Sequence, residues 1–492
     1  MILPINTPIY VKQNFKYNNI HPIFLSEGNQ LFMSEGNSST FLPVNSKYLV
    51  VAIALGVILN PLNTTMITVA LPDIQNDFQL TSKDISWLIA SYFMISAICL
   101  PLTGKISDVY GRKKIFITGL ILVAISSFMA PLSTNVMFLL GMRAIQALGT
   151  SALYPAGIGI IRTYIEKNQN RVISTLSVFA TTSAAFGPTI SGLLVEYGGW
   201  PVIFYVNFPV IILSAILAFK YIPGDSKFAA KTFKWDVIGI ILFGLFLSSW
   251  MFFLLSLESG FSLWRMIVSI LFTFSFYYFE KKKSEPFINV IYLRKNLNVS
   301  FLYVQYILAT VVFFSMLLAM PSYLQTVVML DSKTAGLMML SISIFAMLMT
   351  PIATRWIERA GFRIPLLFGG IVGIVGVGLL LLSNRTLPLF WLFMILAIIG
   401  LGNGAVSIGL QNLLYSFVTK QQSGIASGLL MTSRYIGNIL ASSLFGVMFA
   451  SGMSDSSKNG MTVVLLVVTV LSIPGIFYIT KLRSYSETDG TL

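Results

Sequence analysis

Long apolar stretches recur along nearly the whole chain after residue 46, and each is about as long as a helix that crosses a bilayer. Such a helix needs roughly 20 mainly apolar residues. The spacing of the stretches predicts fourteen membrane spans. We place them at about 47–69, 83–104, 114–132, 135–161, 172–195, 201–221, 235–257, 262–280, 297–320, 334–356, 364–383, 387–416, 424–451 and 460–480.

Composition agrees with an all-α integral membrane protein. Of the 492 residues, 55% are hydrophobic and 10% are charged, against about 25% charged in soluble domains. The net charge of +14 would suit a nucleic-acid-binding surface, but no hydrophilic segment is large enough to fold into one. We therefore expect membrane lipids, and no nucleic acid, as surroundings of this chain.

The residues that most catalytic and metal sites need are scarce. The chain has one histidine, His21, and one cysteine, Cys99. Neither a Cys/His metal site nor a Ser–His or Cys–His nucleophile pair is therefore expected, and the sequence lacks a G-x-x-x-x-G-K-[ST] phosphate loop. We predict that the protein is not an enzyme and uses no cofactor and no metal.

The basic residues predict an orientation. If the N-terminus is cytoplasmic, the fourteen predicted spans place 25 of the 32 Lys and Arg residues on the cytoplasmic side. Cytoplasmic loops of membrane proteins are enriched in these two residues. We therefore expect a multi-pass protein of the cell membrane with both termini in the cytoplasm.

A basic segment between the second and third predicted spans, residues 104–114, has the composition of a conformational switch. Gly104 and Gly111 permit a tight turn and a close approach of helices. Asp108 can accept hydrogen bonds from a helix N-terminus and pair with an arginine; Arg112 lies in the same segment. Such a latch would favour one conformation and break in another. The alternative is a basic turn that only fixes the topology.

A weaker copy of this segment at 354–363 follows the tenth predicted span and again combines basic residues with one acid and a glycine. Parallel repeats are common in transporters, whose substrate site lies near the midplane between the halves. We predict a disordered cytoplasmic tail at 1–46, a six-helix bundle at 47–221, and two inserted helices with a cytoplasmic linker at 222–296. A second six-helix bundle at 297–480 and a cytoplasmic tail at 481–492 follow.

Four segments resemble motifs of the major facilitator superfamily, and within it the fourteen-helix drug:proton antiporter branch. Residues 104–114 resemble its G-x-L-a-D-r-x-G-r-[RK]-[RK] loop, and residues 140–152 resemble its fourth-helix motif around an arginine, here Arg143. Residues 187–192 resemble the fifth-helix G-P-x-x-G-G antiporter motif, and residues 62–72 resemble the first-helix L-D-x-T-x-V-x-V-A-L-P pattern.

Two positions depart from these motifs: Asn63 replaces the usual aspartate of the first-helix pattern, and Ser191 replaces a glycine of the fifth-helix motif. The resemblance implies a secondary carrier that works by alternating access and exports hydrophobic or amphipathic small molecules by proton antiport. It also implies that Arg143, with Gln146 following it, acts in proton coupling or in organising the substrate.

Two arginines, Arg143 and Arg434, lie within predicted spans. An arginine at the centre of a membrane helix costs about 2.5–3.5 kcal/mol on insertion scales, so each should face the bundle interior or a wet cavity. We assign both, with Asn63 and Gln146, to a coupling or substrate cavity. The alternative for Arg143 is structural: hydrogen bonds to Gln146, Asn63 or backbone carbonyls.

The segment Gly187–Pro188 removes one helix hydrogen bond and predicts a kink, which a membrane helix tolerates when its neighbours satisfy the freed backbone. Gly192 adds a small residue for close helix packing. We interpret Gly187, Pro188 and Gly192 as a shaped gate or sliding surface. Ordinary helix packing is the alternative.

Proton coupling has little support from the acidic residues. None of the 18 falls in the middle of a predicted span, whereas a proton carrier needs a titratable group within its pathway. Asn63 cannot titrate, so Asp108, Glu196 and Glu258 remain as candidates near helix ends, and protons remain a possible coupling ion.

The function that these observations favour is export of a small-molecule substrate by a monomeric carrier. Two alternatives stay open. Two arginines in spans that lack central acids favour a uniporter or symporter for an anionic metabolite. A non-transporting membrane sensor built on a carrier scaffold is the other.

Overall fold

The computed structural model describes residues 46–165, 169–224, 236–257, 260–283, 286–418 and 423–481. They all belong to one compact unit, Val44–Leu492. They form sixteen α-helices and one short 3-10 helix, with no strand in the described ranges. The predicted tails 1–46 and 481–492 lie, apart from Ser46 and Lys481, outside these ranges.

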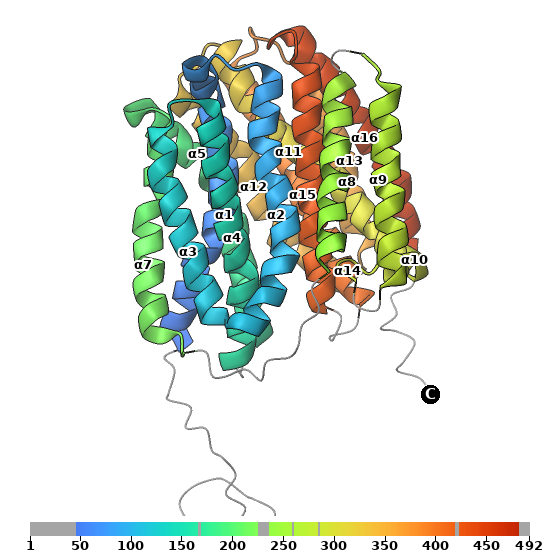
Figure 1. Cartoon of the computed structure of the whole chain (residues 1–492). Helices are drawn as coiled ribbons and strands as arrows, with labels where there is room; N and C mark the ends of the chain where they lie inside the picture. The colour runs from blue at the N-terminus through green and yellow to red at the C-terminus, as the bar shows by residue number, and fades with distance from the viewer. Residues whose placement is uncertain are drawn as a thin grey trace, which may run out of the picture. The chain divides into compact units, whose positions relative to one another are not determined.

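The first half of the molecule, as we name it here, is a group of long helices that run side by side (Figure 1). Its elements are α1 Ser46–Phe78, α2 Ser82–Tyr110, α3 Arg112–Met129, the 3-10 helix η1 Ala130–Leu132, α4 Val136–Tyr164, α5 Gln169–Gly198, α6 Val202–Tyr205 and α7 Asn207–Tyr221. Helix α1 packs against α4, α5 and α7, and α4 packs against α2 and α3. Helix α1 also contacts α11, Leu297–Thr326 of the second half, so it lies between its own half and the other.

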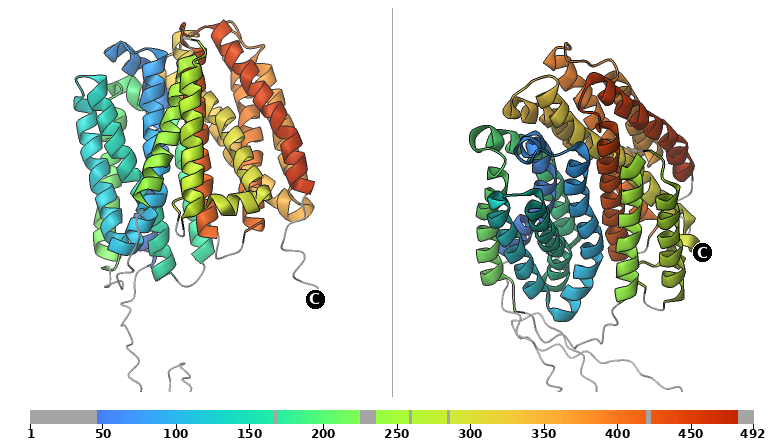
Figure 2. Two further views of the ribbon diagram at one scale, coloured as in Figure 1. Left: turned by 45° about the vertical axis from the view of Figure 1, so that its right-hand side comes forward. Right: turned by 45° about the horizontal axis from the view of Figure 1, so that its top comes forward.

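The second half repeats this arrangement after an inserted hairpin and a short helix. The hairpin is α8 Val237–Ser256 and α9 Leu263–Lys282, and the short helix is α10 Val290–Lys295. The second half consists of α11 Leu297–Thr326, α12 Ser332–Ala360, α13 Arg363–Leu380, α14 Leu389–Ser416, α15 Ser423–Met448 and α16 Asp455–Lys481. Helix α8 packs against α2 of the first half and α15 of the second (Figure 2).

Eleven helical segments of the described ranges are long and apolar enough to cross a membrane, with α6 and α7 counted as one segment. Helices α5, α9 and α15 are not among these eleven. The all-α membrane fold predicted from the sequence is confirmed. The count of fourteen spans stays a prediction.

The halves meet mainly along two helix pairs, α2 with α15 and α5 with α12, and α1 also contacts α11. We call the end of the helices at Gly111 the basic end, because residues 104–114, 281–283 and 355–363 lie there; it is the lower end in Figure 1. The other end, where α1 meets α2, is called the opposite end.

The structure corrects the prediction of a loop at 104–114. Helix α2 continues to Tyr110, and the chain turns at Gly111, whose φ of 110° favours glycine. Gly361, with φ of 73°, separates α12 from α13 in the same way. Gly104 lies inside α2 and makes no turn. Both helices continue through polar and basic residues beyond their apolar stretches. Since we predicted the helix ends from the apolar stretches, the predicted ends came too early.

Candidate functional site

Among the charged residues of the first half whose burial the structure describes, Arg143 is the most buried. It lies on α4 and is 2% exposed. Its guanidinium donates to Gln146 Oε1 at 2.6 Å, and the same nitrogen lies 3.4 Å from the backbone oxygen of Asn63. Its Nε has no hydrogen-bond partner, and no carboxylate of the described residues pairs with it. The cation is therefore balanced by neutral dipoles.

An aromatic ring completes the surroundings of Arg143. Its Cζ atom lies 4.3 Å from the centre of the Tyr92 ring on α2, which is the geometry of a cation–π interaction. The hydroxyl groups of Tyr92 and Thr150 are 2.7 Å apart and hydrogen-bonded. Helices α2 and α4 thus hold the arginine between a π-face and a set of amides.

Side-chain amides extend this arrangement to two more helices. Gln146 Nε2 donates to Asn63 Oδ1 at 3.1 Å. Asn63 and Asn207 donate to each other, at 3.0 and 2.8 Å, and Asn207 also donates to Ser127 Oγ at 3.1 Å. We call Asn63, Ser127, Arg143, Gln146 and Asn207 the polar core. It joins α1, α3, α4 and α7 inside the first half.

Beside the polar core, a second set of contacts crosses to the other half. Asn60 Nδ2 donates to Thr150 Oγ1 at 3.2 Å, and the Tyr435 hydroxyl of α15 donates to Asn60 Oδ1 at 3.3 Å. The Phe93 ring lies 5.9 Å from the Tyr435 ring and 5.0 Å from the Phe314 ring on α11. We call Tyr92, Phe93, Phe314 and Tyr435 the inter-half aromatic cluster.

Arg434 lies on α15, directly before Tyr435, and is half-buried. The structure therefore puts Arg434 near the aromatic cluster but in the other half from Arg143. The sequence did not point to Asn60, Tyr92, Asn207 or Tyr435, although Asn207 is a polar residue within a predicted span.

The Gly187–Gly192 segment lies where α5 contacts α1 and the second half. A Cβ added to Gly187 would collide with Thr65 Oγ1 of α1. One added to Gly192 would lie 2.5 Å from the backbone oxygen of Ser332 and 2.9 Å from Gly336 Cα on α12. Glycine is therefore required at both positions for these helices to approach so closely.

Pro188, the other residue of this predicted gate, is buried in the interior of α5. Its backbone oxygen would lie 2.9 Å from a Cβ added to Gly336. The neighbouring Thr189 Oγ1 donates to the Gly336 oxygen at 2.9 Å. The motif thus lies in the contact between the two halves.

At the basic end, Arg112 makes an ion pair with Asp108, with Nη2 and Oδ1 2.7 Å apart. The Asp108 carboxylate is mostly exposed, with 61% of the side chain accessible. Arg112 also donates to the backbone oxygen of Gly159 at 2.5 Å and to the Thr163 hydroxyl, both on α4. These contacts tie α2 and α3 to α4 within the first half. Glu258 lies outside the described residues.

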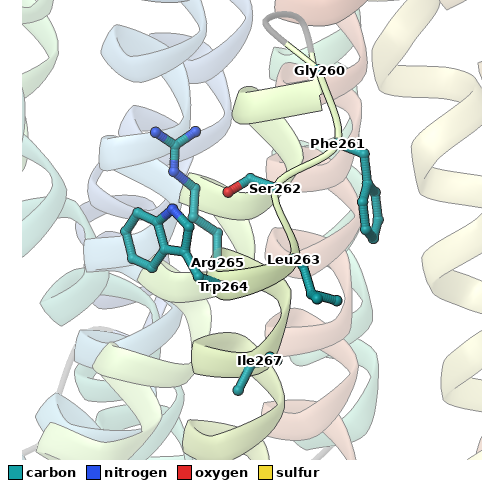
Figure 3. A pocket seen from close by; sticks show the side chains of 7 residues that line it. All are labelled: Gly260, Phe261, Ser262, Leu263, Trp264, Arg265 and Ile267. Atoms are coloured by element: carbon teal, nitrogen blue, oxygen red, sulfur yellow. The ribbon is translucent and has the colours of Figure 1, made fainter.

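An open hollow of about 630 Å³ lies at the turn between α8 and α9 (Figure 3). Its lining includes Trp264 and Arg265, whose Cζ lies 5.3 Å from the Trp264 ring centre. No residue of the polar core or of the aromatic cluster lines this hollow. It is therefore separate from the candidate site.

Known proteins match this chain over most of its length. The family model described as Major Facilitator Superfamily matches residues 53–442. An uncharacterized MFS-type transporter, YwoD of Bacillus subtilis (strain 168), is 38% identical over 85% of this chain and 93% of its own length.

More distant relatives carry names that state an activity. Multidrug resistance protein Stp of Mycobacterium tuberculosis (strain CDC 1551 / Oshkosh) is 26% identical over 82% of this chain and 76% of its own length. Riboflavin transporter RibZ of Clostridioides difficile (strain 630) is 27% identical over 83% of this chain and 89% of its own length.

The fold itself is also found among solved structures. A bacterial homologue of the human lysosomal transporter Spinster, in an inward-facing and unoccupied conformation, has a TM-score of 0.64 at 16% identity. The alignment covers 88% of this chain and 97% of that one. The chain therefore belongs to the major facilitator superfamily, as its sequence motifs and its fold lead one to expect.

Proposed function

We propose that this transporter is a secondary active carrier that exports hydrophobic or amphipathic small molecules in exchange for protons. The observation that carries the proposal is the position of Arg143: a buried cation with no acidic partner in the described structure. Buried charges in membrane helices are costly and mark substrate or ion pathways. The cost of retaining one here supports a role in transport.

The inter-half aromatic cluster supports the substrate class. Tyr92, Phe93, Phe314 and Tyr435 come from α2, α11 and α15, so both halves contribute rings to one surface. Aromatic side chains supply large apolar contact area and a polarisable face. The name of the multidrug resistance relative points to the same class.

Contacts at the opposite end support alternating access. Ser82 Oγ of α2 donates to the Phe449 oxygen at 2.7 Å, and Gln325 Nε2 of α11 donates to the Val69 oxygen of α1 at 3.0 Å. With the close approach at Gly192, these bonds hold the halves together at that end. If the basic end is cytoplasmic, they close the carrier toward the outside.

Protons are proposed as the coupling ion on the evidence of sequence motifs. The polar core contains amides, a hydroxyl and a guanidinium but no carboxylate, and Asn63 stands at the acidic position of the family pattern. The motif at Asp108 and the resemblance to antiporters are what favour protons as the coupling ion.

An anionic solute is the second candidate. Arg143 and Arg434 lie in different halves, so an anion between the halves would approach both. A relative named as a riboflavin transporter supports carriage of one metabolite in place of a range of drugs.

Transport into proteoliposomes under an imposed pH gradient tests the proposal. We would compare wild type with Asp108→Asn and Arg143→Ala on cationic dyes and on organic anions, with Arg385→Ala, an exposed cation between α13 and α14, as the matched control for Arg143→Ala. Dye transport driven by the gradient, lost in Arg143→Ala and kept in the control, supports antiport. Accumulation of anions without a gradient would favour the second candidate.

A further inference from the structure

Two buried carboxylates lie at the base of the inserted hairpin, away from the polar core. Asp236 directly precedes α8 and is 5% exposed, and Glu280 lies in the last turn of α9 and is 1% exposed. The connector, as we name the chain between α9 and α11 that includes α10, passes beside them. The backbone nitrogen of Phe287 donates to Asp236, and that of Ile288 donates to Glu280.

Asp236 is surrounded by donors. Its Oδ1 accepts from the Gly239 nitrogen at 3.1 Å and lies 3.6 Å from Lys283 Nζ, and its Oδ2 accepts from the Phe287 nitrogen at 3.3 Å. It also sits at the N-terminus of α8, where the helix dipole favours negative charge. Both oxygens of Asp236 therefore have donors close by.

Glu280 is not surrounded in this way. Its Oε2 accepts from the Ile288 nitrogen at 3.1 Å, but its Oε1 is buried and has no hydrogen-bond partner. A Cβ added to Gly239 would collide with both Glu280 Oε1 and Asp236 Oδ2. The two oxygens therefore share the small space beside Gly239. Two bare carboxylate oxygens in such a space repel, and a proton between them removes the repulsion.

The other charged groups nearby do not replace that proton. Of the charged groups that the structure describes, Asp236 is the one that shares the space beside Gly239 with Glu280. Lys283, 40% exposed, is paired with Asp236, and Lys281 and Lys282 are exposed. On α10, Arg294 donates to the Tyr277 hydroxyl at 3.2 Å and Lys295 is exposed.

We propose that Asp236 and Glu280 form a binding site for one proton, held on Glu280 Oε1 and donated to Asp236 Oδ2, which fastens the connector to the hairpin. Loss of the proton sets two carboxylates against each other and loosens the bonds to Phe287 and Ile288. Helix α8 contacts both halves, and the connector leads into α11. Protonation of this site therefore affects how firmly the hairpin and the connector hold the two halves together. The proposal does not depend on which solute the protein carries.

Hydrogen–deuterium exchange of the full-length protein in lipid nanodiscs tests the site through the Phe287 and Ile288 amides. Exchange is read from mildly acidic to mildly alkaline pH and divided by the exchange of an unstructured peptide of residues 286–290 at the same pH, which removes the intrinsic pH dependence. We expect relative protection of the two amides to fall several-fold as the proton is lost. Relative protection that does not change with pH in the wild type would overturn the proposal without any variant.

A variant separates the proton from other causes. In Glu280→Gln an amide N–H takes the place of the carboxyl proton, so protection should stay high at every pH. Glu358→Gln removes an exposed acid at the same end and should keep the wild-type pH response. A pH response in Glu280→Gln equal to that of the wild type would contradict the proposal.

Discussion

Asn63 on α1 and Asn207 on α7 donate to each other through their side-chain amides, at 3.0 and 2.8 Å, inside the first half. The pair uses both the oxygen and the nitrogen of each amide, and Asn63 Nδ2 donates in addition to the Leu59 oxygen at 2.7 Å. Neither residue carries charge. The family pattern has an aspartate at position 63, so this amide pair occupies the place of a carboxylate near Arg143.

Asn63→Asp should give the polar core an acid that it lacks. The carboxylate would lie next to Gln146 Nε2, which is 3.1 Å from Asn63 Oδ1, and close to Arg143. We expect transport to become more dependent on pH and cationic substrates to be favoured. Parallel dye-uptake measurements across a pH series check this.

The matched control for that variant is Asn76→Asp, which places the acid at an exposed position of the same helix, α1, outside the polar core. Its pH profile should follow that of the wild type. If Asn63→Asp behaves like this control, position 63 does not take part in coupling.

Arg143→Met should separate a transport role from a structural one. The change leaves Gln146 Oε1 without its donor, at a cost of about 1–3 kcal/mol, but it also removes a buried cation that costs about 2.5–3.5 kcal/mol on insertion scales. We therefore expect an unfolding temperature equal to or above that of the wild type, with transport lost. A clearly lower unfolding temperature would mean that Arg143 mainly stabilises the fold.

Gly192→Ala should open the contact between the halves at the opposite end. The added Cβ would lie 2.5 Å from the Ser332 oxygen, which is backbone and cannot move aside. Spin labels at the exposed positions Tyr197 and Met329 should then give a distance distribution with a larger long component. Gly428→Ala, where a Cβ meets nothing within 4 Å, is the control; equal distributions in the two variants would refute the prediction.

Lys458→Met should destabilise the second half. Lys458 is fully buried, and its ammonium donates to the Leu380 oxygen at 3.0 Å, to the Ser383 hydroxyl at 2.8 Å and to the Ser383 backbone oxygen. Hydrogen bonds to charged groups contribute about 1.5–3 kcal/mol each, so a measurable fall in unfolding temperature is expected. Arg385→Met, an exposed cation at the same end, should change it little.

The sequence predicted the positions of the long helices because their apolar length is a local property. The predicted helix ends were less accurate. Helix α1 runs to Phe78, beyond the predicted end at 69. Helix α16 begins at Asp455, so Lys458, which lies between two predicted spans, is helical and buried. Hydropathy treats a lysine as polar and contains no information on its partners, here the backbone oxygens of Leu380 and Ser383 at the end of α13.

Long-range pairing accounts for what sequence patterns missed in the site. Arg143 and Gln146 lie three residues apart, on one face of a helix, and their contact could be expected from that spacing. Asn63 and Asn207 are 144 residues apart, and Asn60 and Tyr435 are 375 apart. No local pattern indicates which polar residue of one helix faces which residue of another, so these partners emerge only from the packed structure.

The most direct test of antiport is to measure substrate and proton movement in the same proteoliposomes. Vesicles loaded with a transported dye and a trapped pH indicator are diluted into dye-free buffer at equal pH, with the membrane voltage clamped. If the carrier is an antiporter, dye efflux drives protons inward and acidifies the lumen, and Arg143→Met abolishes both signals. Dye efflux with no change in luminal pH would contradict antiport.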